Sequence, residues 1–401
     1  MSKTDKLTHS YPELGTGPVS VEPYMSKEIF QLEKEKVFKK SWLSVAHESD
    51  LPESGSYITR DIAVLDASII IVRAKDGTIK AFHNVCKHRG HRVALEKSGK
   101  ASAFRCLFHA WTYSTDGDLV AVPDEGNFFD QDKSKLGLTP VAVDCWKGFI
   151  FINVDPTPRE TLSESMGELL NMFEGYPCEE WAPAVTMRAE LNCNWKMVQD
   201  AFMEAYHVIA LHQHSAPLAF SSRENPFAHL NGIRLYKKHR GITVYGNPNQ
   251  NVIPSAQVNV KYASTGVYVT ADNSEEQFKN APLGVNPDRR KDYAFDSCLV
   301  HPNFSFYTSY GWVLAARYWP VEAEKSVYEI TLYMPPAATP SQRVAMEQSV
   351  AHTFDVVLED LSTVERTQDV LHSGAITEMQ LSDMELAIRH GCKVISDEIN
   401  A

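Results

Sequence analysis

Two short motifs, each made of one cysteine and one histidine, restrict the fold of this chain more than any other feature of its sequence. Cys86 and His88 form a Cys-x-His pair, and Cys106 and His109 form a Cys-x2-His pair after seventeen intervening residues. Thiolates and imidazoles are soft and borderline ligands that suit iron and zinc. The fold must therefore bring two separate loops together around one metal centre, with one ligand of each kind from each loop.

Turn signals indicate that both loops belong to β-hairpins. Each motif directly follows a strand-like run, at residues 78–85 and 103–105. Asp-Gly pairs at 76–77 and 116–117 lie between alternating or apolar runs, which is the strongest short-range signal for a hairpin. We therefore expect an all-β domain in which two hairpin loops close on the metal centre.

The ligand set indicates a specific kind of centre. In a Rieske [2Fe–2S] cluster two histidines replace two cysteines on one iron, which raises the reduction potential to a range of roughly −150 to +300 mV. The same four side chains could instead hold a structural zinc ion. Zinc fingers usually place both cysteines before both histidines, whereas each segment here supplies one of each. A Rieske cluster, which accepts one electron at a time, is the favoured interpretation.

Composition limits the class of protein. The 401 residues suffice for one large or two ordinary domains, and 43% of them are hydrophobic. The net charge of −12 argues against nucleic acid as a partner. The sequence has no run of about 18 apolar residues and no apolar signal-peptide core at its start. We therefore expect no membrane span. The five cysteines other than Cys86 and Cys106 have no disulfide-framework spacing, so we expect a reduced, cytoplasmic environment.

The balance of charge reverses near the metal motifs. Residues 87–105 hold six lysines or arginines and one acid, Glu96. A basic rim of this kind would suit an acidic electron carrier. The same side chains could equally serve only to keep the surface solvated, so both interpretations stay open.

A second group of polar residues lies between residues 194 and 212. On a helix, Asp200, Glu204 and His207 fall within about 60° of one another, opposite an apolar side. A solvated polar face would look much the same. His207 and His212 are five residues apart, so their rings would point about 140° apart on an unbroken helix. If both bind one metal, the helix must open just after His207.

Both segments resemble one protein family. Residues 80–123 are similar to the Rieske domain of ring-hydroxylating oxygenases, and residues 194–212 are similar to the mononuclear iron segment of the same enzymes. The two motif sets occur in the order and spacing of the family. The resemblance implies an α+β protein, with an N-terminal all-β Rieske [2Fe–2S] domain and an α/β helix-grip (Bet v1/START-like) catalytic domain that holds mononuclear iron.

The resemblance also implies the roles of individual residues. Two histidines and one carboxylate suit an oxygen-activating Fe(II), because they leave coordination positions open for O2. Asp355 and Glu359 are rivals for the carboxylate ligand. Asp200, Gln199 and Tyr206 are expected to shape the pocket or to support the iron ligands from behind. The implied ligands are Cys86, His88, Cys106 and His109 for the cluster, and His207, His212 and Asp360 for the iron.

Glu204 has the most mechanistic role that the resemblance implies. It can hydrogen-bond the ring nitrogen of His207 that faces away from the metal. In the family this acid also meets a cluster histidine of a neighbouring subunit, here His109, which implies a head-to-tail homotrimer. Aromatic-ring dioxygenases usually carry Asp at this position, whereas Glu is usual in choline and carnitine monooxygenases. Leu107 and Ala110 replace the usual Pro and Gly of the second cluster loop.

These features predict the terminal oxygenase component of a multicomponent Rieske oxygenase. A reductase, ferredoxin or both would deliver electrons from NAD(P)H, and O2 would hydroxylate an aromatic or related organic substrate. Oxidative N- or O-dealkylation, including that of quaternary ammonium compounds, is the alternative for the same site. A pure Rieske electron-transfer protein is a further alternative, but it leaves roughly 240 residues without a role.

Breaks in the pattern predict three parts of the chain. These are an N-terminal helical segment at 1–50 that packs on the catalytic domain, the Rieske domain at 51–157, and the catalytic domain at 158–401. Within the last part we expect a helix near 160–175, strands near 184–192 and 297–335, and two C-terminal helices. Aromatic residues of the stretch 220–320 are candidates for the pocket lining, namely Phe220, Phe227, Phe304, Tyr307 and Trp312.

Overall fold

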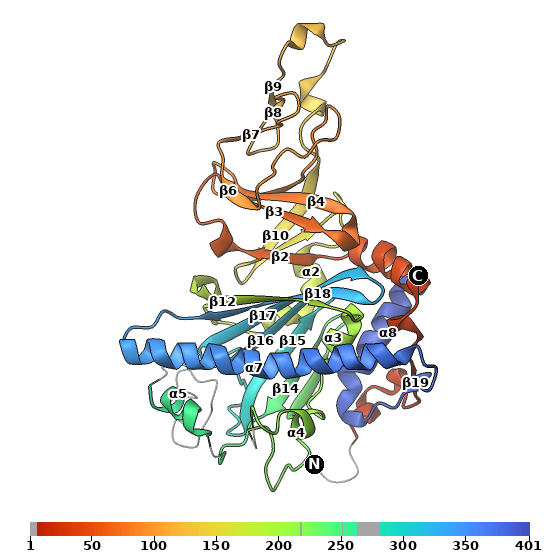
Figure 1. The fold of residues 1–401 in the computed structure, drawn as a ribbon, viewed down its shortest axis with the longest axis vertical. Coiled ribbons are helices and arrows are strands. Elements are labelled where there is room, and N and C mark those ends of the chain that lie inside the picture. Colours follow the sequence, from red (N-terminus) through yellow and green to blue (C-terminus); the bar gives the residue numbers. More distant parts are fainter. Residues whose placement is uncertain (1–5, 217–218, 251, 263–280) are drawn as a thin grey trace. The chain divides into compact units, whose positions relative to one another are not determined.

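The structure, a computed structural model, describes residues 6–216, 219–250, 252–262 and 281–401 (Figure 1). The chain divides into two compact units, Lys34–Ser165 and Met1–Glu33 with Met166–Ala401. The two units are called the cluster unit and the catalytic unit below. The predicted domain limits at residues 50/51 and 157/158 stay predictions. The pocket candidates at 220–320 include residues 251 and 263–280, which lie outside the described residues.

The cluster unit contains two antiparallel sheets. The larger sheet has the strand order β2-β11-β10-β5-β4-β3-β6. The smaller sheet is a three-stranded meander of β7, β8 and β9. The strands are β2 (Leu43–His47), β3 (Ser56–Ile62), β4 (Ala67–Arg73), β5 (Ile79–His83), β6 (Ser98–Lys100), β7 (Ala103–Arg105), β8 (Thr112–Ser114), β9 (Leu119–Ala121), β10 (Pro140–Trp146) and β11 (Phe149–Asn153).

Both predicted Asp-Gly hairpins are present. Gly77 joins β4 to β5 and Gly117 joins β8 to β9, and both have φ near +90°, where L-residues other than Gly, Asn and Asp are rare. Gly117 is also restricted by packing, because a Cβ there would lie 2.4 Å from the ring of Phe82. The apolar side chains of both sheets share one core, so the two hairpins and the adjoining loops that carry Cys86 and Cys106 are fixed against each other.

The catalytic unit is built on one seven-stranded antiparallel sheet with long helices on it. The strand order is β12-β18-β17-β16-β15-β14-β13. The predicted α+β class and the strands expected near 184–192 and 297–335 are confirmed, whereas β13 and β14 were not foreseen. The strands are β12 (Ala182–Leu191), β13 (Gly232–Leu235), β14 (Arg240–Tyr245), β15 (Tyr293–Val300), β16 (Phe304–Ser309), β17 (Trp312–Glu322) and β18 (Lys325–Met334).

Two long C-terminal helices cover this sheet, as predicted. Helix α7 (Pro340–Leu371) runs across one face of the sheet (Figure 1). It buries Val357, Leu361 and Val364, a row with helical spacing, among apolar side chains of β12, β17 and β18. Helix α8 (Leu386–Asn400) follows the Ser382 capping box and packs on β13 and β14. Among the described residues, every helix is too short or too polar to cross a bilayer.

The remaining helices are short. They are α1 (Lys27–Leu32), α2 (Leu162–Met166), α3 (Trp195–Ala201), α4 (Val208–Leu211) and α5 (Gln257–Tyr262). Near 160–175, where one helix was expected, α2 continues as a 3-10 turn to Asn171. The two-residue strands β1 (Val19–Ser20) and β19 (Glu378–Met379) pair and attach the N-terminal segment to the end of α7.

The helix considered over residues 195–209 is interrupted before His207, not just after it. Asn194 caps α3 by accepting a hydrogen bond from the Lys196 amide, but α3 ends at Ala201. The carboxylate of Glu204 accepts hydrogen bonds from the backbone amides of Tyr206 and His207. These contacts satisfy backbone donors locally and so compete with the helical hydrogen bonds. A new helix, α4, then begins just after His207 and ends just before His212.

Candidate active site

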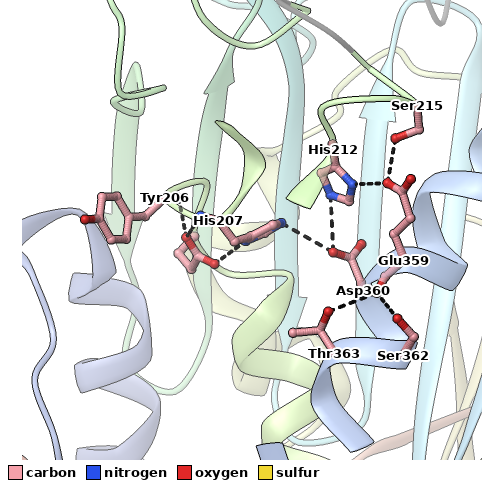
Figure 2. Close-up of polar contacts among 9 residues, drawn as sticks. Tyr206, His207, His212, Ser215, Glu359, Asp360, Ser362 and Thr363 are labelled. Atoms are coloured by element: carbon pink, nitrogen blue, oxygen red, sulfur yellow. Dashed lines mark hydrogen bonds and ion pairs between the residues drawn. The ribbon is translucent and has the colours of Figure 1, made fainter. Parts of the chain in front are cut away.

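Three side chains converge in the catalytic unit. One ligand atom from each of His207, His212 and Asp360 can be chosen so that all three lie within 4.8 Å of one another. The Nε2 atoms of the two histidines lie 3.4 Å and 3.2 Å from the same oxygen, Oδ1 of Asp360 (Figure 2). His207 and His212 flank the short helix α4, and Asp360 comes from α7. Helix α4 is a single turn, and the two histidines at its ends face one point with Asp360.

A second carboxylate lies behind each imidazole. Nδ1 of His207 is hydrogen-bonded to Oε1 of Glu204. Nδ1 of His212 lies 2.7 Å from Oε2 of Glu359 (Figure 2). The hydroxyl of Ser215 donates a second hydrogen bond to Oε2 of Glu359, with a donor–acceptor distance of 2.6 Å. Each carboxylate accepts a hydrogen bond from the Nδ1–H group of its histidine, so Nδ1 must carry the ring proton. The lone pair of Nε2 then points toward the other triad ligands.

The triad has the chemistry of a metal site. Oδ1 of Asp360 is buried and receives no hydrogen bond, although buried acceptors are nearly always satisfied. Burial opposes protonation of His207 and His212, but the surrounding carboxylates outweigh this and raise the pKa of both rings. Two lone pairs and a carboxylate oxygen that face one another favour a bound cation. Two histidines and one carboxylate on one side of an ion match the facial triad of non-haem Fe(II) oxygenases.

Adjacent residues of α7 serve the two sides of His212. Asp360 faces Nε2 of this histidine, whereas Glu359, considered above as a rival ligand, contacts Nδ1. Asp355, the other rival, is not part of the triad. The hydroxyls of Ser362 and Thr363 donate to the carbonyl of Glu359, which keeps their polar atoms within the helix (Figure 2).

A cavity of about 150 Å³ adjoins the triad. Its walls come from the α3–α4 segment, from strands β14 to β17, and from the side of α7 that leads to Asp360. The lining is mostly apolar and includes Phe202, Phe220, Phe295, Tyr307 and Trp312. Three of the five predicted aromatic residues, Phe220, Tyr307 and Trp312, therefore line it, whereas Phe227 and Phe304 do not.

The residues expected to shape the pocket or to support the iron ligands lie outside the cavity lining. Asp200 is half-buried and accepts a 2.6 Å hydrogen bond from the hydroxyl of Tyr24, and burial raises its pKa to about 6. Gln199 donates to the carbonyl of Pro302, and Tyr206 is largely exposed. None of the three belongs to the described lining of the cavity. Asp200 and Gln199 instead support α3, the helix from which the triad segment emerges.

The cluster unit brings its four proposed ligands onto two similar loops. Cys86 and Cys106 are buried, and burial together with the neighbouring Cys86 thiol raises the pKa of Cys106. The rings of His88 and His109 have centroids 4.5 Å apart. The carbonyls of Cys86 and Cys106 each accept a hydrogen bond from the amide four residues later, which gives the two loops the same shape. Nδ1 of His88 is buried without a hydrogen bond, as expected for a ring that awaits a metal.

Two neighbours fix the cluster loops from inside. The hydroxyl of Tyr113 lies 3.3 Å from Sγ of Cys86 and accepts a 2.9 Å hydrogen bond from the Lys87 amide. The ring of His88 stacks on Trp111, with centroids 5.0 Å apart. Hydrogen bonds and packing of this kind orient metal ligands and tune a cluster's potential. Trp111 and Tyr113 lie within the segment that resembles the Rieske domain, but their role had no separate signal in the sequence.

Sequence reasoning missed several residues around the triad. Glu359 was considered only as a ligand, although two adjacent acids on a helix can reach opposite sides of one imidazole. Ser215, which supports Glu359, had no signal beyond its closeness to His212. The cavity residues Phe202 and Phe295 are aromatic positions that look like ordinary core residues in the sequence.

Comparisons with known proteins agree with this geometry. The family model of the ring hydroxylating alpha subunit (catalytic domain) matches residues 178–401, and that of the Rieske [2Fe-2S] domain matches residues 41–145. A carnitine monooxygenase oxygenase subunit of Acinetobacter baumannii is 39% identical over 187 residues, 46% of this chain and 49% of the relative. A chlorobenzene dioxygenase subunit alpha of Cupriavidus is 34% identical over 189 residues, 46% of this chain and 42% of the relative. The chain thus spans about half the length of the curated relatives it matches.

Solved structures share the fold over almost the whole chain. A quaternary ammonium Rieske monooxygenase superposes with a TM-score of 0.75 and 24% identity, covering 96% of this chain and 97% of that chain. Naphthalene 1,2-dioxygenase from Rhodococcus superposes with a TM-score of 0.79 and 21% identity, covering 98% and 97%. At these identities the likeness shows the fold alone.

Proposed function

Because this chain belongs to the ring-hydroxylating oxygenase alpha-subunit family and carries a Rieske [2Fe–2S] domain, we propose that it oxidises a small organic substrate with O2. A separate reductase, ferredoxin or both supply electrons from NAD(P)H to the cluster. The cluster ligands are Cys86, His88, Cys106 and His109. The mononuclear iron ligands are His207, His212 and Asp360.

One observation carries the proposal: the carboxylate-supported triad opens onto an apolar cavity. Iron bound there would supply the activation of O2 that organic side chains cannot perform. Glu204 and Glu359 hold the Nδ1 protons of the two histidines, so that both Nε2 atoms stay unprotonated and correctly oriented. The apolar walls exclude bulk water and hold the substrate beside the triad.

Oxidation of a quaternary ammonium compound, by hydroxylation or N-dealkylation, is a second candidate. Relatives named for carnitine and glycine betaine are 39% and 35% identical over about half their length. At the position of Glu204, Glu is usual in the choline and carnitine monooxygenase branch of the family. Phe220, Phe295 and Trp312 lie around the cavity, and aromatic faces attract organic cations. The relative named for chlorobenzene keeps arenes as the first candidate.

Metal analysis of the purified protein tests the proposal. We expect three irons and two acid-labile sulfides per chain, with O2 consumption that depends on a reductase and a substrate. Asp360→Ala should lose one iron and all O2 consumption but keep the visible spectrum of the cluster. Asp355→Ala, on the same helix but outside the triad, is the matched control and should keep all three irons.

Two results would contradict the proposal. Two irons per wild-type chain, with a normal cluster spectrum and no O2 consumption, would indicate a pure electron-transfer protein. A colourless protein with one zinc would indicate the structural zinc site that the four cluster ligands could also form.

A further inference from the structure

Residues 122–139 form a long loop between β9 and β10 of the cluster unit. Both ends of the loop are fixed in the core of this unit, where Val122 and Leu138 are buried. The amide of Leu138 also donates a 2.7 Å hydrogen bond to the carbonyl of Gly117 in the β8–β9 hairpin. The loop therefore begins and ends at fixed points, although most of the side chains between them are exposed.

Phe128 brings this loop into contact with a proposed cluster ligand. Its ring meets the rings of His88 and Trp111 edge-on, with centroids 5.9 Å and 5.7 Å apart. The next residue, Phe129, is 98% exposed. Phe128 has an extended backbone that follows a short 3-10 turn at Glu125–Asn127, and successive side chains of an extended chain point in opposite directions. The turn thus directs one of two consecutive phenylalanines inward.

The two proposed histidine ligands of the cluster have different surroundings. The ring of His88 stacks on the buried ring of Trp111, with an interplanar angle of 9°, and its edge meets Phe128. Nδ1 of His88 is buried. The ring of His109 instead lies against Phe108, which is itself about half exposed. Two aromatic rings therefore separate His88 from water, and one of them belongs to the 122–139 loop.

Exclusion of water from a cluster has a definite effect on its reduction potential. With two ferric ions, two sulfides, two thiolates and two neutral imidazoles, an oxidised Rieske cluster is formally neutral. The one electron that it accepts from the carrier gives the reduced cluster a negative charge. A charge is less stable in an apolar environment than in water, and solvent exposure is one of the factors that set cluster potentials. Apolar rings around the cluster therefore lower its potential.

We propose that Phe128 keeps the reduction potential of the cluster low by excluding water from His88. Phe128 acts through His88, so it is a positioning residue rather than a catalytic one. A low potential makes the reduced cluster a stronger donor and increases the free-energy drop for the electron on its way to the mononuclear iron. The proposal rests on the proposed function, because it requires a Rieske cluster that passes its electron on.

Redox titration of the purified holoenzyme tests the proposal. Phe128→Ala opens the space beside His88 to water and should raise the potential. The equilibrium constant for reduction by a one-electron mediator should increase about tenfold, which corresponds to about 59 mV. Phe129→Ala removes the exposed neighbouring ring and is the matched control, with an unchanged potential. Phe128→Leu keeps a large apolar side chain and should stay close to the wild type.

Pulsed EPR of the reduced cluster in D2O shows whether water is the cause. Phe128→Ala should increase the deuterium modulation from solvent near the cluster, whereas Phe129→Ala should not. Phe128→Asn is a second variant, and it should raise the potential at least as far because its amide attracts water. An unchanged potential in Phe128→Ala and Phe128→Asn, or a raised potential without added deuterium modulation, would overturn the proposal. Loss of the cluster from every Phe128 variant would also overturn it, because the ring would then only support the fold.

Failure of this proposal is distinguishable from failure of the proposed function. Wild-type protein without the visible spectrum of a Rieske cluster, or without O2 consumption, would contradict the proposed function. Wild-type protein with three irons, a normal cluster spectrum and O2 consumption, whose potential does not change in Phe128→Ala, would contradict only the role of Phe128.

Discussion

The two carboxylates behind the triad hold their histidines in the same way but do not have the same surroundings. Glu359 contacts His212 and Ser215, both in the catalytic unit. Glu204 contacts His207 and two backbone amides, and we propose that it also bridges to a cluster histidine of a neighbouring copy, as the family resemblance implies. Substitution of the two acids separates these roles.

Glu204→Gln and Glu359→Gln should both weaken iron binding, on the order of 10- to 100-fold, because an amide does not fix the histidine tautomer as a carboxylate does. Excess Fe(II) should then restore O2 consumption to Glu359→Gln. It should not restore it to Glu204→Gln, whose cluster should keep its visible spectrum and still be reduced. Full activity of iron-saturated Glu204→Gln would exclude a bridging role.

Ala110 tests the cost of a departure from the family pattern. It has φ +60°, a left-handed conformation that strains a residue with a Cβ. Gly90, at the equivalent place in the first cluster loop, has φ +79° and no such strain. Ala110→Gly should therefore raise stability by about 1 kcal/mol. The measurement is the temperature at which cluster absorbance is lost, and Gly90→Ala, the reverse change, should lower it.

At the scale of elements, α3 is held by a buried network of charges. Lys196 forms a 2.6 Å ion pair with Glu33, and both side chains are almost completely buried. Asp200 accepts a hydrogen bond from Tyr24, and its negative charge faces the buried guanidinium of Arg240. Helix α3 is thus tied to the N-terminal segment and to β14. This network fixes where α3 ends and hence where the segment with Glu204 and His207 begins.

Gly391 makes room for this network on α8. A Cβ at position 391 would lie 2.6 Å from the Cζ atom of Arg240. The guanidinium is fully buried and has little space to move. Gly391→Ala should therefore lower the free energy of unfolding by about 1–3 kcal/mol despite the better helix propensity of alanine.

Chemical denaturation, followed by a signal that reports unfolding of the catalytic unit, measures the change in the free energy of unfolding of Gly391→Ala. Lys393→Ala, two residues further along α8, removes only an exposed ion pair with Asp397 and should change stability by less than about 0.5 kcal/mol. Equal stability of Gly391→Ala and the wild type would mean that Arg240 is free to rearrange.

At the scale of the whole molecule, the chain carries two redox sites in two compact units. In the proposed function an electron passes from one site to the other, and the resemblance to the family implies that it passes between copies of the chain in a head-to-tail trimer. We propose this assembly for the present chain. Light scattering should then give a mass three times that of the chain.

Mixed oligomers test whether transfer occurs between copies. Cys106→Ser removes a cluster ligand and Asp360→Ala removes an iron ligand, so each variant alone should be inactive. Co-expressed in equal amounts, they should regain about a quarter of the wild-type rate, because half of the copies supply an intact donor and half an intact acceptor in a closed ring. Mixed oligomers without activity would show that both sites of one chain must be intact. As a control for exchange of subunits between oligomers, the two variants are also purified separately and then mixed.

Chemistry that lies close together along the chain could be predicted from the sequence. Cluster ligands next to hairpin turns, and two histidines within six residues, are encoded by spacing and turn residues that act over a few positions. Which acid faces the two histidines depends on the folded structure. Glu359 and His212 are 147 residues apart, and the choice between Asp355, Glu359 and Asp360 depends on how α7 packs across the sheet. The cavity is likewise formed by side chains from several distant elements, so its size and charge follow from packing that no local pattern encodes.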